Sequence, residues 1–211
     1  MGSALVIFGL FGLAMVSKKN NIETVNPSAT DNQSDKSGQN AQSSGFAKLL
    51  APISDWSERT TKKLFGIYVT PKNSPVNPEK FTGYHSGVDF EVLPGEEDTE
   101  VVVFAVCGGP MVLKRFVSGY GGAVVQQCVF EEQDIIVIYG HLKLSSIVLA
   151  MGQEIKAGEK IGILGNSYGA ETDGERKHLH VGIHKGKDID LKGYVQTSTE
   201  LDEWMDITKY L

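Results

Sequence analysis

Four of the five histidines in this chain of 211 residues fall in three short motifs. The motifs are HSGVD at residues 85–89, YGHL at residues 139–142 and HLH at residues 178–180. Imidazole and carboxylate groups together form a ligand set that suits Zn²⁺, and imidazoles also transfer protons near neutral pH. The motifs therefore predict a metal site, an acid–base pair, or both in one cleft.

The HLH motif is expected on a β-strand, where side chains at positions i and i+2 point to the same face. His178 and His180 would then project side by side, and Leu179 would point into the core. His85 and Asp89 flank a glycine, and a strand that enters from a loop could bring both to one face. These two residues and one histidine of the HLH pair would provide three ligands and leave a fourth position open, as catalytic zinc sites do.

The remaining two histidines are interpreted differently from each other. His141 follows a β-branched run and adds another imidazole to the group. His184 has the strand parity of His178 and His180 but lies further along, so we interpret it as a structural or surface residue. A single histidine on a strand usually has that role, whereas the patterns H-x3-D and H-x-H together favour a functional site.

The elements that must position these residues are short β-branched runs, separated by glycine-rich or acidic turns. The runs expected to be strands are residues 100–108, 110–119, 122–131, 134–142 and 178–185. Such a series favours a mainly β, antiparallel fold. The tail at residues 199–211 is expected to be a short helix or a covering segment.

The chain begins with an apolar segment at residues 1–19, which we interpret as a secretory signal or membrane anchor. As a helix with ~1.5 Å per residue, its apolar run is roughly 20 Å long, shorter than a ~30 Å hydrocarbon core. That length fits a secretory signal better than a membrane span, although no Lys or Arg precedes the run and two lysines follow it. A buried hydrophobic helix is the alternative. We expect export to the cell envelope, the periplasm or the extracellular space, with the segment either cleaved or retained as an anchor.

Three further regions follow the apolar segment. Residues 20–45 contain almost no large apolar side chain and are predicted to be a disordered polar linker. Residues 46–65 are expected to form a short helix or a surface segment, and residues 66–211 the folded domain.

Charge and cysteine content limit the partners and the compartment. The formal net charge of −6 provides no broad basic surface, so we expect no nucleic-acid partner. Cys107 and Cys128 lie on neighbouring predicted strands, and an exported chain could join them in one disulfide. Two buried free thiols are the alternative, and the sequence leaves both open.

Four ordered motifs resemble a known family over roughly residues 66–190. HSGVD, YGHL, KAGEKIGILGNSYG and HLH, in this order, are similar to the lysostaphin/LytM-type zinc metalloendopeptidases of bacterial cell walls. The resemblance implies a twisted antiparallel sheet or β-sandwich-like domain with a substrate groove. It makes residues 66–211 a zinc metallopeptidase domain that hydrolyses peptide cross-links or stem peptides of peptidoglycan. It also implies zinc ligands and a catalytic histidine pair, which would be His85, Asp89 and His180 for the metal and His141 and His178 for catalysis.

The chain departs from the family pattern in three places. Gly83 stands where the family often has Arg, two residues before the first ligand. The stretch SYGAETDGERK replaces a short Ser-Thr-Gly-Pro turn, and Val181-Gly182 replaces the usual Phe-Glu. These departures bear on substrate choice rather than on catalysis. The charged segment ETDGER at residues 171–176 could gate the groove or could be an ordinary solvent-exposed loop.

Two non-catalytic functions are the alternatives. The domain could be a regulator that binds a wall hydrolase or a divisome partner, but such family members generally lose zinc ligands and this chain keeps them. It could also be a binding module with a structural zinc. His141 and His178 argue against that, because a closed structural site does not need two more histidines beside the ligands.

Overall fold

The computed structural model describes residues 48–211 of the chain. The apolar segment at residues 1–19 and the polar linker at residues 20–45 lie outside the described residues. Among the helices from residue 48 onward, none has the length and apolar character needed to cross a membrane.

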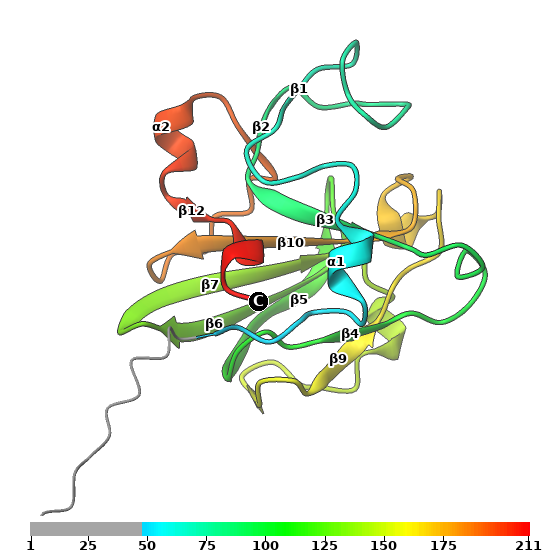
Figure 1. Ribbon diagram of the computed structural model, residues 1–211. Coiled ribbons are helices and arrows are strands. Elements are labelled where there is room, and N and C mark those ends of the chain that lie inside the picture. Colours follow the sequence, from blue (N-terminus) through cyan, green and yellow to red (C-terminus); the bar gives the residue numbers. More distant parts are fainter. Residues whose placement is uncertain (1–47) are drawn as a thin grey trace, which may run out of the picture. The chain divides into compact units, whose positions relative to one another are not determined.

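The described residues form mainly short strands with a few helical turns (Figure 1). The strands are β1 (Tyr68–Val69), β2 (Gly83–His85), β3 (Gly87–Glu91), β4 (Val102–Phe104), β5 (Gly109–Val117), β6 (Gly121–Phe130), β7 (Gln133–Gly140), β8 (Glu154–Ile155), β9 (Lys160–Ile163), β10 (His178–Lys185), β11 (Tyr194–Val195) and β12 (Trp204–Met205). The helices are α1 (Trp56–Arg59) and α2 (Ser198–Leu201), with 3₁₀ turns η1 (Leu144–Ser146), η2 (Ala170–Thr172) and η3 (Ile207–Lys209).

All of the paired strands run antiparallel, which confirms the mainly β, antiparallel fold predicted from the sequence. The main sheet has the order β12-β10-β7-β6-β5-β8, and β3 also pairs with β10. Two small sheets, β1-β2-β11 and β4-β9, accompany it. Strand β10 lies beside both β7 and β3 (Figure 1), so three strands from distant parts of the chain meet around the HLH motif.

Strand β7 lies in the middle of the main sheet and is buried on both faces, which explains its continuous apolar run. Ile135 and Val137 pack in one hydrophobic cluster, and Ile136 and Ile138 pack in a second cluster on the opposite face. A strand covered on both sides needs apolar residues at every position instead of alternation. Leu179 is fully buried, as predicted from the parity of the HLH motif.

Cys107 and Cys128 form a disulfide, which decides between the two alternatives that the sequence left open. Cys128 lies on β6, and Cys107 lies just before β5. The bond therefore ties the turn that precedes β5 to the neighbouring strand.

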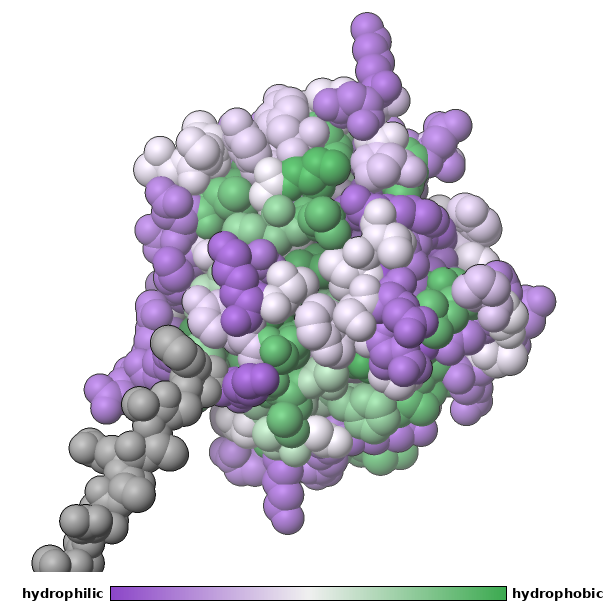
Figure 2. All heavy atoms as spheres, viewed as in Figure 1, coloured by the Kyte–Doolittle hydropathy of each residue, from purple (hydrophilic) through white to green (hydrophobic). Residues whose placement is uncertain are grey.

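The segment before β1 is part of the folded unit. It contains α1, and its side chains Ile53, Arg59 and Lys63 are buried. The backbone N–H of Leu49 donates to the carbonyl of Tyr210, which joins this segment to the tail of the chain. On the face shown in Figure 2, several separate hydrophobic areas lie among hydrophilic residues.

Candidate metal centre

Strands β3 and β10 bring four polar side chains to one place through their register. His180 stands opposite Asp89, and His178 stands opposite Glu91. Residues two apart on a strand share a face, and directly opposed residues on antiparallel strands have neighbouring side chains. The pattern H-x-H on one strand and D-x-E on the other therefore places all four side chains on one face of the pair.

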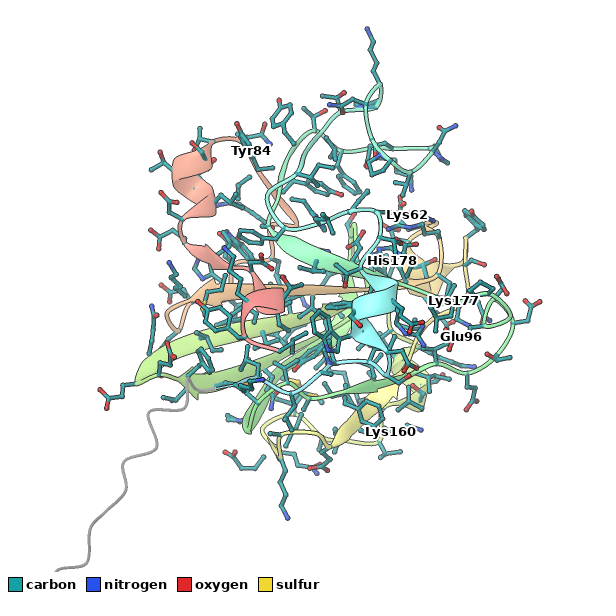
Figure 3. The ribbon with its side chains drawn as sticks, viewed as in Figure 1. Lys62, Tyr84, Glu96, Lys160, Lys177 and His178 are labelled. Atoms are coloured by element: carbon teal, nitrogen blue, oxygen red, sulfur yellow. A yellow bond between two sulfur atoms is a disulfide. The ribbon has the colours of Figure 1, made fainter. Side chains whose placement is uncertain are left out.

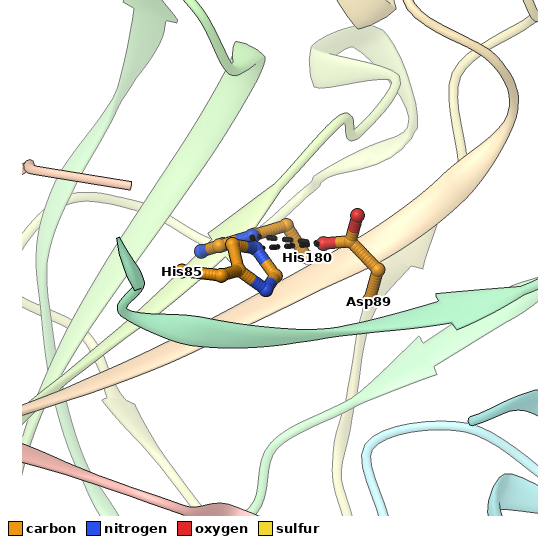
Figure 4. A group of neighbouring side chains, drawn as sticks. All are labelled: His85, Asp89 and His180. Atoms are coloured by element: carbon orange, nitrogen blue, oxygen red, sulfur yellow. Dashed lines mark hydrogen bonds and ion pairs between the residues drawn. The ribbon is translucent and has the colours of Figure 1, made fainter. Parts of the chain in front are cut away.

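His85 completes a cluster of three donor atoms with Asp89 and His180 (Figure 4). Its Nε2 atom is 3.1 Å from Nδ1 of His180 and 3.3 Å from Oδ1 of Asp89. Nδ1 of His180 is 3.0 Å from the same carboxylate oxygen. The three residues are only 1–4% exposed, so water screens their interactions little.

The cluster fits a zinc ion. Nδ1 of His85 is 3.2 Å from the carbonyl oxygen of Leu64, which can only accept, so we assign the ring proton to Nδ1. The lone pair on Nε2 then faces the other two donors, as the outer hydrogen bond of a metal-bound histidine requires. Zinc bonds of ~2.0–2.2 Å in a tetrahedral site separate the ligand atoms by about 3.3–3.5 Å. The donor atoms observed here are 3.0–3.3 Å apart.

The protonation states of these groups also suit metal binding. Burial lowers the pKa of His180 to about 4, although Asp89 acts in the opposite direction. Burial alone would raise the pKa of Asp89, but the neighbouring His178 and His85 hold it well below its usual range. At neutral pH the His180 ring is therefore neutral and the Asp89 carboxyl is ionised, which are the forms that coordinate metals.

His141 and His178 lie together beside this cluster. Their ring centroids are 4.2 Å apart. His178 donates from Nδ1 to the carbonyl of Arg176 at 2.8 Å, and its Nε2 is 3.2 Å from Oδ2 of Asp89. Burial lowers the pKa of His141 well below its usual value, so this ring is neutral near pH 7.

His141 has an unusual backbone conformation. It follows the last residue of β7 and has a φ of 63°, in the left-handed region. Such a conformation costs a non-glycine residue about 1–3 kcal/mol and is found preferentially at functional sites. Among residues 48–211, Nδ1 of His141 is one of the few buried polar side-chain atoms without a hydrogen-bond partner.

A cavity of about 290 Å³ lies next to the two groups. Asp89, His141, His178 and His180 line it, together with side chains from other parts of the fold. The predicted groove is thus present as a concave space, and it is lined by both predicted catalytic histidines and by two of the three predicted ligands, Asp89 and His180.

The charged segment at residues 171–176 forms an ion pair and hydrogen bonds with segments next to this cavity, so it is not a free solvent-exposed loop. Lys80 contacts a carboxylate oxygen of Glu175 at 3.1 Å and the carbonyl of Asp173 at 3.2 Å. The Asp173 side chain accepts a hydrogen bond from the backbone N–H of Gly119 at 2.7 Å. Lys80 therefore reaches from the segment before β2 to the segment before β10.

Two charged residues of the site were not identified from the sequence. Nη2 of Arg176 donates to Oδ2 of Asp89 at 2.8 Å. Lys63 forms a buried ion pair with Glu79 at 2.6 Å and donates to the hydroxyl of Tyr194 at 2.8 Å. The position of Arg176, two residues before His178, could have identified it, because it continues the parity of the HLH motif and predicts a side chain on the same face. Lys63 gives no such signal, because it lies outside the motifs.

Neighbouring strands explain one departure from the family pattern, Gly83, and restrict the space at a second, Gly182. A Cβ atom on Gly83 would lie 2.6 Å from the carbonyl oxygen of Val195, so β11 leaves no room for Arg at this position. The ring of Trp204 lies 3.3 Å from the Cβ position of Gly182. His184 packs against Trp204, with ring centroids 4.9 Å apart, and is not part of the metal cluster.

The family model of peptidase family M23 matches residues 83–191, more than half of the chain. The chain therefore belongs to peptidase family M23, and the resemblance to lysostaphin/LytM-type peptidases is confirmed. A comparison with curated proteins gave no match.

Three solved structures are similar to the chain at low sequence identity. The catalytic domain of the antimicrobial peptidase lysostaphin from Staphylococcus simulans is 20% identical, with 76% of this chain and 98% of that chain covered and a TM-score of 0.48. LytU is 21% identical, with 80% and 97% covered and a TM-score of 0.46. Helicobacter pylori Csd3 is 22% identical, with 72% of this chain but only 36% of Csd3 covered and a TM-score of 0.45.

Proposed function

We propose that this protein is a zinc-dependent endopeptidase that hydrolyses peptide cross-links or stem peptides of bacterial peptidoglycan. The observation that carries the proposal is that His85, Asp89 and His180 converge beside the His141–His178 pair, next to one cavity. Membership of peptidase family M23 supports it. In this proposal the first three residues are the zinc ligands and the other two are catalytic.

The chain's own residues divide the chemistry between them. A zinc ion held here would supply a Lewis acid that lowers the pKa of water and polarises a peptide carbonyl. His141 is neutral at pH 7 and can accept a proton, and His178 is held in orientation by its hydrogen bond to the Arg176 carbonyl. One histidine can take a proton from the attacking water and a histidine can return one to the leaving amine.

We also propose that the protein acts outside the cytoplasm, at the cell envelope, in the periplasm or extracellularly. The Cys107–Cys128 disulfide supports an oxidising compartment. Residues 1–19 would be the export signal or membrane anchor and residues 20–45 a polar linker. A divisome or hydrolase partner would then approach the domain at the membrane surface.

Release of dye from labelled peptidoglycan tests this function. The purified protein with zinc should release dye, a chelator should stop the release, and added zinc should restore it. Asp89→Ala is the matched control, because it removes one ligand and leaves His141 and His178 in place. Release by Asp89→Ala at the wild-type rate would refute the proposal.

A further inference from the structure

Strand β3 carries two buried carboxylates on the same face, and one guanidinium lies between them. Asp89 and Glu91 are 2% and 7% exposed. Nη2 of Arg176 donates to Oδ2 of Asp89 at 2.8 Å and to Oε1 of Glu91 at 2.5 Å, and its Nε donates to Oε2 of Glu91 at 3.0 Å. The guanidinium is therefore fixed by Glu91 from two nitrogen atoms while it holds Asp89 with one of them.

The two oxygens of Asp89 have separate partners. Oδ1 faces Nε2 of His85 and Nδ1 of His180, at 3.3 Å and 3.0 Å. Oδ2 accepts a hydrogen bond from Arg176 and also lies 3.2 Å from Nε2 of His178. The guanidinium thus fixes the rotation of the carboxylate through Oδ2. Oδ1, which faces the two imidazoles, has no contact with the guanidinium.

The backbone of Arg176 acts on the second group of the site. Its carbonyl accepts the Nδ1 proton of His178, so one residue contacts a ligand through its side chain and a catalytic histidine through its main chain. Glu91 has a second cationic partner, Lys62. Nζ of Lys62 lies 3.2 Å from Oε2 of Glu91, and the Lys62 side chain is 45% exposed. Lys62 and His178 are both labelled in Figure 3, which draws the side chains on the ribbon.

We propose that Arg176 is a positioning residue, which holds Asp89 in the orientation that binds the metal. The proposal rests on the proposed function, because it gives Asp89 the role of a metal ligand. Outer groups that orient a metal ligand typically change metal affinity or activity by about 10- to 100-fold when they are removed.

Charge alone predicts the opposite effect, so the direction of the change is informative. A guanidinium repels a metal cation, and its loss would then tighten metal binding. Glu91 offsets that repulsion, because it contacts the guanidinium through both of its oxygens. The orientation of Asp89 therefore dominates, and loss of Arg176 weakens binding.

Arg176→Gln and Lys62→Gln form a matched pair for the test. Each removes one positive charge next to Glu91, but only Arg176 contacts Asp89. Zinc dissociation constants are measured by competition with a chelator, and the visible spectrum of the Co²⁺-loaded protein reports the ligand geometry. We expect Arg176→Gln to bind zinc about 10- to 100-fold more weakly and to change the Co²⁺ spectrum. Lys62→Gln should resemble the wild type.

Arg176→Lys separates geometry from charge. Lysine keeps the charge but lacks the planar fork that contacts two carboxylates, so its affinity should lie between those of Arg176→Gln and the wild type. Circular dichroism of the metal-free proteins checks the fold, and Arg176→Lys carries the test if Arg176→Gln does not fold.

Three results would overturn the positioning role. They are unchanged or tighter zinc binding in Arg176→Gln, equal weakening in Lys62→Gln, and a wild type that binds no zinc. A wild type that binds zinc but releases nothing from peptidoglycan would refute the proposed function alone, since the affinity comparison does not depend on turnover.

Discussion

Asp89 and His180 stand directly opposite each other on β3 and β10, and their Oδ1 and Nδ1 atoms are 3.0 Å apart. The register of two strands that are about ninety residues apart in sequence thus sets the geometry of the predicted ligands. Any change that shifts this register, or tilts either side chain, should act first on metal binding.

His180 and His184 offer a comparison within one strand. His180→Ala removes a proposed ligand and should weaken zinc binding by at least about tenfold, while activity is lost. His184→Ala removes a histidine that packs on Trp204 and is not part of the cluster. It should keep zinc affinity and activity, with at most a lower melting temperature. Isothermal titration with zinc distinguishes the two, and equal zinc binding by both variants would contradict the ligand assignment.

His141→Asn should separate metal binding from turnover. Asparagine tolerates the left-handed backbone conformation that His141 adopts, so the local fold should persist. General acid–base groups typically contribute about 10²- to 10⁴-fold, and we expect a loss of kcat in that range with zinc still bound. Kinetics on a peptide substrate and metal analysis of the same sample measure both quantities. Full activity of the variant would remove His141 from the catalytic pair.

Gly87→Ala should disturb the site through packing. A Cβ atom at this position would lie 2.6 Å from two ring atoms of His180 and from the carbonyl of Val181. Overpacking of this kind costs about 1–3 kcal/mol, so the melting temperature and the zinc affinity should both fall. Gly108→Ala is the control, because its nearest neighbours would be 3.8 Å away or more. Equal melting temperatures for the two variants would show that the His180 ring and the Val181 carbonyl both yield to the added methyl group, and would contradict the expected overpacking.

The buried pair of Lys63 and Glu79 should make stability depend on pH. Burial alone would raise the pKa of Glu79, but hydrogen bonds from Lys63, Phe81 and Ser74 lower it below the ordinary value of 4.5. A carboxyl with a lowered pKa stabilises the fold above its unfolded pKa, and this contribution is lost as the pH falls through the folded value.

Glu79→Gln leaves the Lys63 ammonium buried without its counter-charge, and we expect it to destabilise the protein by about 3 kcal/mol near pH 7. The difference from the wild type should begin to shrink near pH 4, below the ordinary value of 4.5, because the carboxyl of the unfolded wild type takes up protons there. Urea unfolding at both pH values measures it. Glu132→Gln, at an exposed position, should change stability by less than about 0.5 kcal/mol at either pH. A pH-independent difference for Glu79→Gln would contradict the ion pair.

The strands of the site could be predicted because their patterns are local. Residues 178–185 were expected to be a strand and form β10 with the same bounds. The parity of the HLH motif also placed Leu179 in the core, where it is fully buried. Alternation with a period of two depends only on neighbouring residues, so one sequence is enough to read it.

The surroundings of the ligands could not be predicted, because they depend on contacts between distant segments. Leu64, which fixes the ring of His85, and Lys63 come from a segment that the sequence assigned to a short helix or surface stretch. The contact between Arg176 and Asp89 requires the register of β3 and β10. Propensity and spacing do not encode which strands become neighbours.

Mass spectrometry of the fragments released from purified peptidoglycan tests the central claim most directly. The wild-type protein with zinc should release peptides whose new ends identify one cleaved bond. His141→Asn with zinc bound should release them far more slowly, and Asp89→Ala should release none. If the zinc-loaded wild type releases no new peptide ends from several types of peptidoglycan, the protein is not the endopeptidase proposed here.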